Sequence, residues 1–345
     1  MTHVPIIAQP LSVVKGYLLL RVQCLRPGTV PRVSYERGLV QVGPTTYAFL
    51  QPDGSWGWSN AGLVVGDEAA ILVDTFFDLP NTAELLSSVR TATDRPIRTL
   101  VNTHHNGDHC FGNQLVEGAT IVGHRRCRDE LLRGATPALL AAAADAPDEP
   151  GAAGYLKRAF SPFDFSGIDV VAPTVTFEDR LSLHAGDHEV QLEYFGPCHT
   201  LGDIAVWVPG DRVLFAGDLA FIGSTPLVWE GSLINWIATV DRLLALEPEV
   251  IVPGHGPVTN AEGLRSMDTY LRHVVTEGSK LKDAGLTPQD AAREIDLGAY
   301  AAWKDPERLV LNLMRLWLEL DGQPAETRVD AFEAFAAMDA LARAV

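Results

Sequence analysis

Short runs of β-branched and aromatic residues alternate with turn signals in the first part of the chain. Between Leu39 and Asp74, the runs LVQVG, TYAFL, AGLVVG and AAILVDT are separated by segments such as PDGS and GDE. Apolar runs of this length, bounded by Gly, Pro and Asp, are typical of β-strands joined by turns. The pattern therefore predicts a meander of strands that forms half of a sandwich.

The pattern then changes to alternating helices and strands. A helix is predicted at residues 81–91 and a buried strand at 97–102, and two more helices are predicted at 125–132 and 137–144. The stretch that follows, up to residue 154, is rich in Ala, Asp, Pro and Gly, and we expect a surface excursion there. An insertion at this place would form one wall of a substrate cleft.

A second series of strands echoes the first and completes an α/β pattern. Strands are predicted at 174–177, 189–195, 203–208, 213–216 and 250–252, with a helix at 233–246 before the last of them. From Ala261 onward, apolar residues recur at helical spacing. We therefore predict an N-terminal extension (1–35), a main domain (36–260) and a helical C-terminal subdomain (261–345). The wide apolar face of the last part predicts a homodimer.

Composition and charge narrow the classes of function. Hydrophobic residues make up 47% of the chain and charged residues 21%, the balance of an ordinary globular protein. The formal net charge of −17 repels phosphate backbones and anionic membranes, so neither nucleic acid nor a membrane is expected as a partner. The chain has no apolar run long enough to span a bilayer, and its start does not resemble a signal peptide. We expect a cytoplasmic enzyme with a small-molecule substrate.

The segment VNTHHNGDHCFGNQL, residues 101–115, concentrates metal-binding side chains where a predicted strand ends. It contains His104, His105, Asn106, Asp108 and His109. Imidazole nitrogens and carboxylate oxygens are suitable ligands for Zn²⁺ or iron. A polar surface loop is the alternative interpretation of this segment taken alone.

Three later segments support a metal site over a surface loop. GPCHTLGD places His199 after a strand, FAGDL ends a strand in Asp218, and VPGHGP ends another in His255. The four cysteines are widely spaced and form no CxxC pair, so a cysteine zinc cluster is not indicated. Cys110 and Cys198 each adjoin a candidate ligand, and we expect neither of them to bind metal.

This ordered series resembles the metallo-β-lactamase fold superfamily, whose motif T-H-x-H-x-D-H is followed by G-H-T-like, G-D and G-H-G-like segments. The resemblance runs from about Leu39 to Pro257 and implies an αββα sandwich. It also implies that one metal is held by His104 and His199, that a second is held by Asp108, His109 and His255, and that Asp218 bridges the two. The carboxylates supply the negative charge that two neighbouring cations need.

The resemblance implies a metal-dependent hydrolase. A metal-bound hydroxide would attack a small ester, lactone, thioester or amide, with Asp108 and His109 as the catalytic candidates. Two Zn²⁺ ions are expected, and iron or manganese are alternatives. An iron-dependent oxidoreductase or oxygenase on the same fold is the second hypothesis, and a binding protein that has lost its metal is the third.

The chain departs from the family motif at Asn106, where a second histidine is expected. An amide oxygen is a weaker zinc ligand than imidazole, so Asn106 either contacts the metal weakly or contacts the substrate. Asp74, at the end of AAILVDT, is expected to orient a ligand. Five aromatic residues are predicted to line the substrate pocket, with packing in the core or at the edge of the sandwich as the alternative for each: Trp56, Trp58, Phe76, Phe221 and Trp229. Trp56 and Trp58 lie on a loop that can be a mobile flap in relatives.

Overall fold

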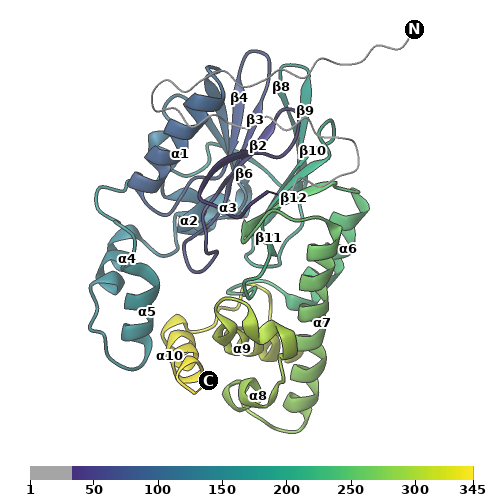
Figure 1. Cartoon of the computed structure of the whole chain (residues 1–345). Helices are drawn as coiled ribbons and strands as arrows, with labels where there is room; N and C mark the ends of the chain where they lie inside the picture. Colours follow the sequence, from purple (N-terminus) through teal and green to yellow (C-terminus); the bar gives the residue numbers. More distant parts are fainter. Residues whose placement is uncertain (1–32, 345) are drawn as a thin grey trace, which may run out of the picture.

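Two β-sheets lie face to face between layers of helices (Figure 1). The structure is a computed structural model that describes residues 33–344, so the predicted N-terminal extension falls almost wholly outside the described residues. The predicted αββα sandwich is confirmed. Within residues 33–344, no helix is both long and apolar enough to cross a membrane.

The first sheet has seven strands in sequential order, and its pairing changes from antiparallel to parallel at β4. The meander predicted from the turn residues forms its antiparallel half, and helices connect the parallel half, as parallel strands require. The strands are β1 (Gly38–Gln41), β2 (Thr46–Leu50), β3 (Ala61–Val65), β4 (Ala70–Val73), β5 (Ile97–Asn102), β6 (Thr120–His124) and β7 (Val175–Phe177). The connecting helices are α1 (Leu79–Ala92), α2 (Gly107–Cys110), the short 3₁₀ helix η1 (Asn113–Leu115) and α3 (Arg125–Leu131).

The second sheet has five strands in the order β12-β11-β10-β9-β8. Its β11 and β12 are parallel and are joined through α6 (Leu233–Ala245). The other strands pair antiparallel, and the strands are β8 (Arg180–Ala185), β9 (His188–Tyr194), β10 (Ile204–Val208), β11 (Val213–Phe221) and β12 (Val250–His255). β11 is longer than predicted, because it continues past a register shift at Gly217, where φ is 50°.

Alternating side chains explain why the sheets stack. In β3 and β4, Leu63 and Leu72 face α1, whereas Val64 and Ile71 face the second sheet. The helix α1 begins two residues before its predicted start, because the carboxylate of Asp78 accepts a hydrogen bond (2.9 Å) from an amide of the first turn and caps the helix. These central strands of the first sheet thus bury both of their faces, and the strand ends remain free to carry functional groups.

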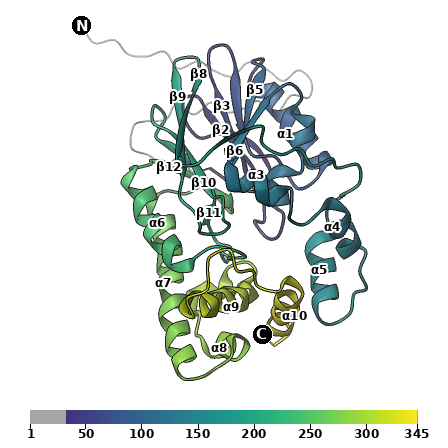
Figure 2. The same cartoon turned by 180° about the vertical axis from the view of Figure 1, so that it is seen from behind.

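The remaining helices gather at one end of the sandwich (Figures 1 and 2). The helices α4 and α5 come from the predicted insertion, and α5 begins inside the stretch that was predicted to be irregular. α10 packs against α5 although it comes from the other end of the chain. The bounds are α4 (Pro137–Ala144), α5 (Ala152–Phe160), α7 (Ala261–Asp283), α8 (Pro288–Glu294), η2 (Gly298–Ala302), η3 (Pro306–Arg308), α9 (Leu309–Leu320) and α10 (Ala331–Ala342).

The β2–β3 loop, residues 51–60, is bonded to the segment that leads into α9. Asp53 forms an ion pair with Lys304. The hydroxyl of Ser55 donates to the carboxylate of Asp305 at 2.9 Å. These contacts join two segments that are about 250 residues apart in the sequence.

Trp56, at the tip of the same loop, is held by two further contacts. The guanidinium of Arg308 lies 4.3 Å from the centre of its indole ring, a cation–π arrangement. The indole N–H donates to the hydroxyl of Tyr155 at 3.0 Å, and this hydroxyl donates to Glu307 at 2.7 Å. In this structure, the loop that can be a mobile flap in relatives is attached to the C-terminal helices.

Candidate metal centre

The histidine-rich segment lies at the end of β5 and runs into α2. The side-chain amide of Asn102, the last residue of β5, donates to the carbonyl of His109 (3.2 Å) and so fixes the start of α2 beneath the strand end. Gly107 opens this helix, and a Cβ there would lie 2.7 Å from Phe111 and 2.8 Å from Phe77. Only glycine allows this close approach, which aims Asp108 and His109 at the second sheet.

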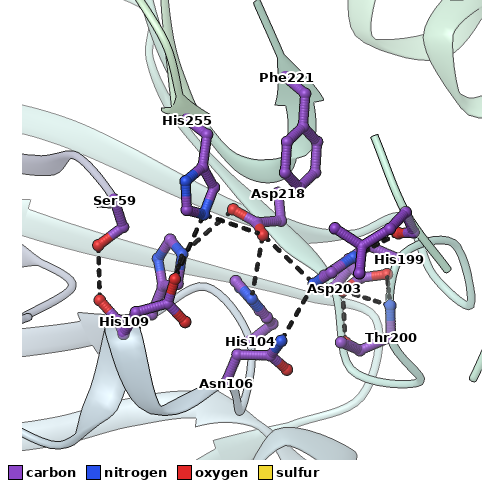
Figure 3. Close-up of polar contacts among 12 residues, drawn as sticks. Ser59, His104, Asn106, His109, His199, Thr200, Asp203, Asp218, Phe221 and His255 are labelled. Carbon is purple, nitrogen blue, oxygen red and sulfur yellow. Dashed lines mark hydrogen bonds and ion pairs between the residues drawn. The ribbon is translucent and has the colours of Figure 1, made fainter. Parts of the chain in front are cut away.

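Four histidines surround the carboxylate of Asp218 (Figure 3). Its Oδ2 atom lies 3.2 Å from Nε2 of His199, 3.5 Å from Nε2 of His255 and 3.7 Å from Nε2 of His104. Its Oδ1 atom lies 3.1 Å from Nε2 of His109. These residues come from the loop after β9, the end of β12 and the loop after β5, so the two sheets jointly form the cluster.

Asp108 completes the set of six predicted ligands. Its Oδ2 atom lies 3.3 Å from Nε2 of His255 and 3.9 Å from Nε2 of His109. Two groups of ligand atoms lie close enough together to hold an ion, namely His104, His109 and Asp218, and Asp108, His109 and His255. The second group matches the predicted division of the ligands, whereas the first contains His109 in place of the predicted His199.

The chemistry of these side chains fits a bound cation. Nε2 of His104, Nε2 of His109 and Oδ1 of Asp218 are buried and have no hydrogen-bond partner. Each such atom costs roughly 1–3 kcal/mol when it is left without a partner. Burial opposes the charge of Asp218, yet the surrounding histidines hold its pKa well below the usual range. The cluster therefore offers an anionic carboxylate and unpaired imidazole nitrogens to a metal.

Asp74 orients the loop from beneath, as predicted. Its carboxylate lies 2.9 Å from Nδ1 of His109 and accepts hydrogen bonds from the amide and hydroxyl of Thr103, each at 2.7 Å. The backbone of Asp74 has φ 61°, a left-handed conformation that is uncommon for a residue with a side chain. A comparable contact orients His199, whose Nδ1 lies 2.7 Å from the carbonyl oxygen of Leu227. Both contacts leave the Nε2 atom of the imidazole directed at the cluster.

The two cysteines next to ligands point elsewhere. The thiol of Cys110 donates to the carbonyl of His104 at 3.1 Å, and the thiol of Cys198 donates to the carbonyl of Phe195 at 3.4 Å. Neither belongs to a group of possible ligand atoms.

Asn106 points into the cluster, with its amide nitrogen 3.3 Å from Nε2 of His199. It thus occupies the side of the centre where His104 and His199 lie. His105, which was expected to point away, lines the same cavity as Asn106. Among the described lining residues, it is the one histidine outside the six predicted ligands, so it is the candidate to replace the missing histidine.

The structure leads us to expect two metal sites of unequal affinity. The side with Asp108, His109 and His255 offers a carboxylate and two imidazoles, whereas the side with Asn106 offers at most a neutral amide oxygen in place of an imidazole. In metal titrations followed by calorimetry, the wild type should bind a second equivalent at least ~10-fold more weakly than the first. Asn106→His should reduce that difference by tightening the weaker site.

His105→Ala is the control for this titration. It should leave both affinities unchanged if His105 is not a ligand. Two equally tight equivalents in the wild type, with loss of one in His105→Ala, would show that His105 completes the site and that the prediction for Asn106 is wrong.

A cavity of about 450 Å³ opens above the cluster. Three of the five predicted pocket residues line it: Trp56, Phe221 and Trp229. The other two, Trp58 and Phe76, are not among its lining residues. Trp58 packs on Phe163 with ring centroids 4.7 Å apart.

Phe76 is fully buried against Phe49, on the α1 side of the first sheet. Its neighbour Phe77 lines the cavity instead. The insertion that was predicted to form one wall of a substrate cleft supplies α4 and α5, and both helices line the cavity. The individual cavity residues on these helices and on α10 were not predicted, because their apolar spacing is the same as that of ordinary core helices.

Comparisons with known proteins agree with this arrangement. The model of the metallo-beta-lactamase superfamily matches residues 54–255. The linear primary-alkylsulfatase of a Pseudomonas species is 25% identical over 277 residues, which cover 71% of this chain and 51% of the alkylsulfatase. The acyl-coenzyme A thioesterase MBLAC2 of Bos taurus is 26% identical over 228 residues, which cover 60% of this chain and 76% of the thioesterase.

The 2,4-dinitroanisole O-demethylase subunit alpha of a Nocardioides species is 26% identical over 196 residues, 56% of this chain and 51% of that subunit. The chain thus spans about half the length of the alkylsulfatase and of the demethylase subunit.

Solved structures show that the likeness in fold extends beyond the sandwich. The metallo-beta-lactamase from Pontibacter korlensis superposes with a TM-score of 0.53 at 21% identity, covering 69% of this chain and 99% of its own. A stereoselective inverting sec-alkylsulfatase from a Pseudomonas species superposes with a TM-score of 0.63 at 17% identity, covering 84% of this chain and 51% of its own. Since 84% of 345 residues is about 290, the second match reaches past residue 260 into the C-terminal helices.

Proposed function

Because the chain belongs to the metallo-beta-lactamase superfamily, we propose that it is a metal-dependent hydrolase of a small ester, lactone, thioester or amide. The observation that carries the proposal is the convergence of four imidazoles and the carboxylate of Asp108 on the buried carboxylate of Asp218. Such a cluster at the floor of a cavity is the arrangement that metal-assisted hydrolysis needs.

The six predicted ligands would hold two metal ions. His104 and His199 would hold one ion, Asp108, His109 and His255 the other, and Asp218 both. A bound pair of Zn²⁺ ions supplies an activated water and polarises the scissile carbonyl; the same ligands also suit iron or manganese.

Of the two catalytic candidates, only Asp108 lines the cavity. Its carboxylate is therefore placed to orient the attacking water and to accept the proton of that water. His109 is fully buried beneath, where it serves as a ligand held in place by Asp74.

The test compares the metal-loaded protein with the same protein after chelation. Hydrolysis of a panel of neutral p-nitrophenyl esters, thioesters and lactones should be lost when the metal is removed, and it should return with added Zn²⁺. An oxygen electrode runs in parallel. Oxygen consumption by the iron-loaded protein, with no hydrolysis by the zinc-loaded protein, would overturn the proposal in favour of an oxidoreductase.

A further inference from the structure

The cavity extends from the metal cluster toward the helices at the end of the sandwich. Its floor contains Asp108, Asp218 and His255, and its far walls come from α4, α5 and α10. Figures 1 and 2 show these three helices together at that end of the molecule. The far walls carry large apolar side chains, among them Leu139, Leu140, Phe160, Phe332 and Phe335.

The apolar lining continues from the buried interior to the solvent. Phe160 and Phe335 are buried, whereas Leu139 is 61% exposed and Phe332 is 67% exposed. Large apolar side chains exposed on two elements of one cavity are unfavourable in water unless a ligand covers them. A flexible apolar chain, with its reacting end at the cluster, could contact the buried residues and then the exposed pair.

The charged residues of the cavity are already paired with one another. Among the described lining residues, the two arginines are Arg308, which pairs with Asp305 at 2.7 Å, and Arg328. Nε of Arg328 lies 3.2 Å from Glu230, and its terminal nitrogen pairs with Glu130. Glu130 and Glu230 also line the cavity and are buried. Glu130 also lies 3.9 Å from a terminal nitrogen of Arg133, so each arginine of the lining has a carboxylate partner.

Glu230 belongs to this group of paired charges. Burial raises the pKa of Glu230, and the positive charge of Arg328 opposes that rise. None of these side chains offers an unpaired positive charge to an anionic group on a substrate.

We propose that the cavity selects a neutral acyl ester, thioester or lactone with a long, flexible apolar chain, which lies between α4–α5 and α10. The same cavity disfavours alkyl sulfates and other substrates with an anion beside the reacting bond, because both arginines of its lining are already paired with carboxylates. This inference rests on the proposed hydrolase function. Water adds across the acyl C–O or C–S bond: its hydroxyl goes to the acyl carbon, and its proton goes to the released alcohol or thiol.

The first experiment varies the chain length. The zinc-loaded protein is assayed with p-nitrophenyl acetate, hexanoate, decanoate and tetradecanoate. The value of kcat/KM should rise up to fourfold per methylene, equivalent to ~0.8 kcal/mol, until the chain passes the mouth of the cavity. Leu139→Glu and Phe332→Glu, both at exposed positions, should lower kcat/KM for decanoate at least ~10-fold and change that for acetate little. Leu132→Glu, at an exposed position outside the lining, is the matched control and should leave both unchanged.

The second experiment tests the charge preference. Decanol and dodecyl sulfate compete for the cavity against the neutral fluorescent probe N-phenyl-1-naphthylamine. Decanol should displace the probe at lower concentration than dodecyl sulfate. Glu230→Gln, which releases Arg328 from one of its partners, should shift the ratio of the two midpoints at least ~10-fold in favour of the sulfate. Glu130→Gln should act in the same direction and replaces Glu230→Gln if that variant does not fold.

The outcomes separate the inference from the function on which it rests. If the probe binds and decanol displaces it, but no ester of any length is hydrolysed, the proposed function fails and the chain-binding cavity stands. If esters are hydrolysed equally at all chain lengths, or if dodecyl sulfate competes as well as decanol in the wild type, the inference is overturned and the hydrolase stands.

Discussion

Asp218→Ala should lose bound metal and at least ~100-fold in kcat/KM. The carboxylate of Asp218 lies within 3.7 Å of Nε2 of all four histidines, so its removal leaves the imidazoles without the anion around which they are arranged. Loss of a residue that merely supports a ligand costs about 10–100-fold in affinity or activity, and loss of a shared ligand should cost more. Metal content by mass spectrometry and ester hydrolysis should fall together.

A matched control variant shows whether the loss of metal and activity is specific to the metal centre or results from general damage to the fold. Asp211→Ala also removes a carboxylate that accepts hydrogen bonds, from Thr45 and Thr46, but it lies outside the cluster and should retain both metal and activity. His255→Ala should lose metal as Asp218→Ala does. If both Asp218→Ala and His255→Ala kept their full metal content, the assignment of the centre would be wrong.

Asp74→Asn should weaken metal binding about 10–100-fold without unfolding the chain. Asparagine tolerates the left-handed backbone conformation of this position. The substitution removes the negative charge beside Nδ1 of His109 and replaces one of the two oxygens that contact His109 and Thr103 by an amide nitrogen. A metal titration should show a weaker midpoint, and excess Zn²⁺ should restore most of kcat.

Restoration of kcat by excess Zn²⁺ would show that Asp74 positions a metal ligand and does not merely stabilise the fold. A variant that is only less stable would show a lower Tm and no dependence of kcat on the concentration of added zinc. If Asp74→Asn binds zinc as tightly as the wild type, then the contact between Asp74 and His109 does not support the metal.

The sequence predicted the sandwich because the signals for it are local. Strand runs and turn residues in the first 74 residues, and the strand-end positions of His199 and His255, depend on a few neighbouring residues only. The length of β11 was missed, because Asp218 continues a strand whose pairing is set by β12, a partner distant in sequence. The start of α5 was missed because its helix is stabilised by packing on α10.

In the candidate site, too, features set by local motifs were predicted better than features set by contacts between distant segments. The six predicted ligands were read from short motifs, and the structure brings them together. The pocket aromatics were predicted less well, because side chains that are close together in the sequence can point in different directions: Trp56 and Phe77 line the cavity, whereas Trp58 and Phe76 do not. The sequence fixes neither choice without the tertiary arrangement of α5 and α10.

The attachment of the β2–β3 loop to the segment before α9 has a consequence for synthesis of the protein. Ser55 and Asp305 are 250 residues apart, and at roughly 5–20 residues per second the ribosome needs on the order of 10–50 s to make the chain between them. During that interval the sandwich strands can pair, but Trp56 lacks Arg308, and the apolar cavity lacks its wall on α10. The nascent chain therefore presents an open apolar surface to chaperones until α10 emerges, and the cavity is completed only after α10 has been made.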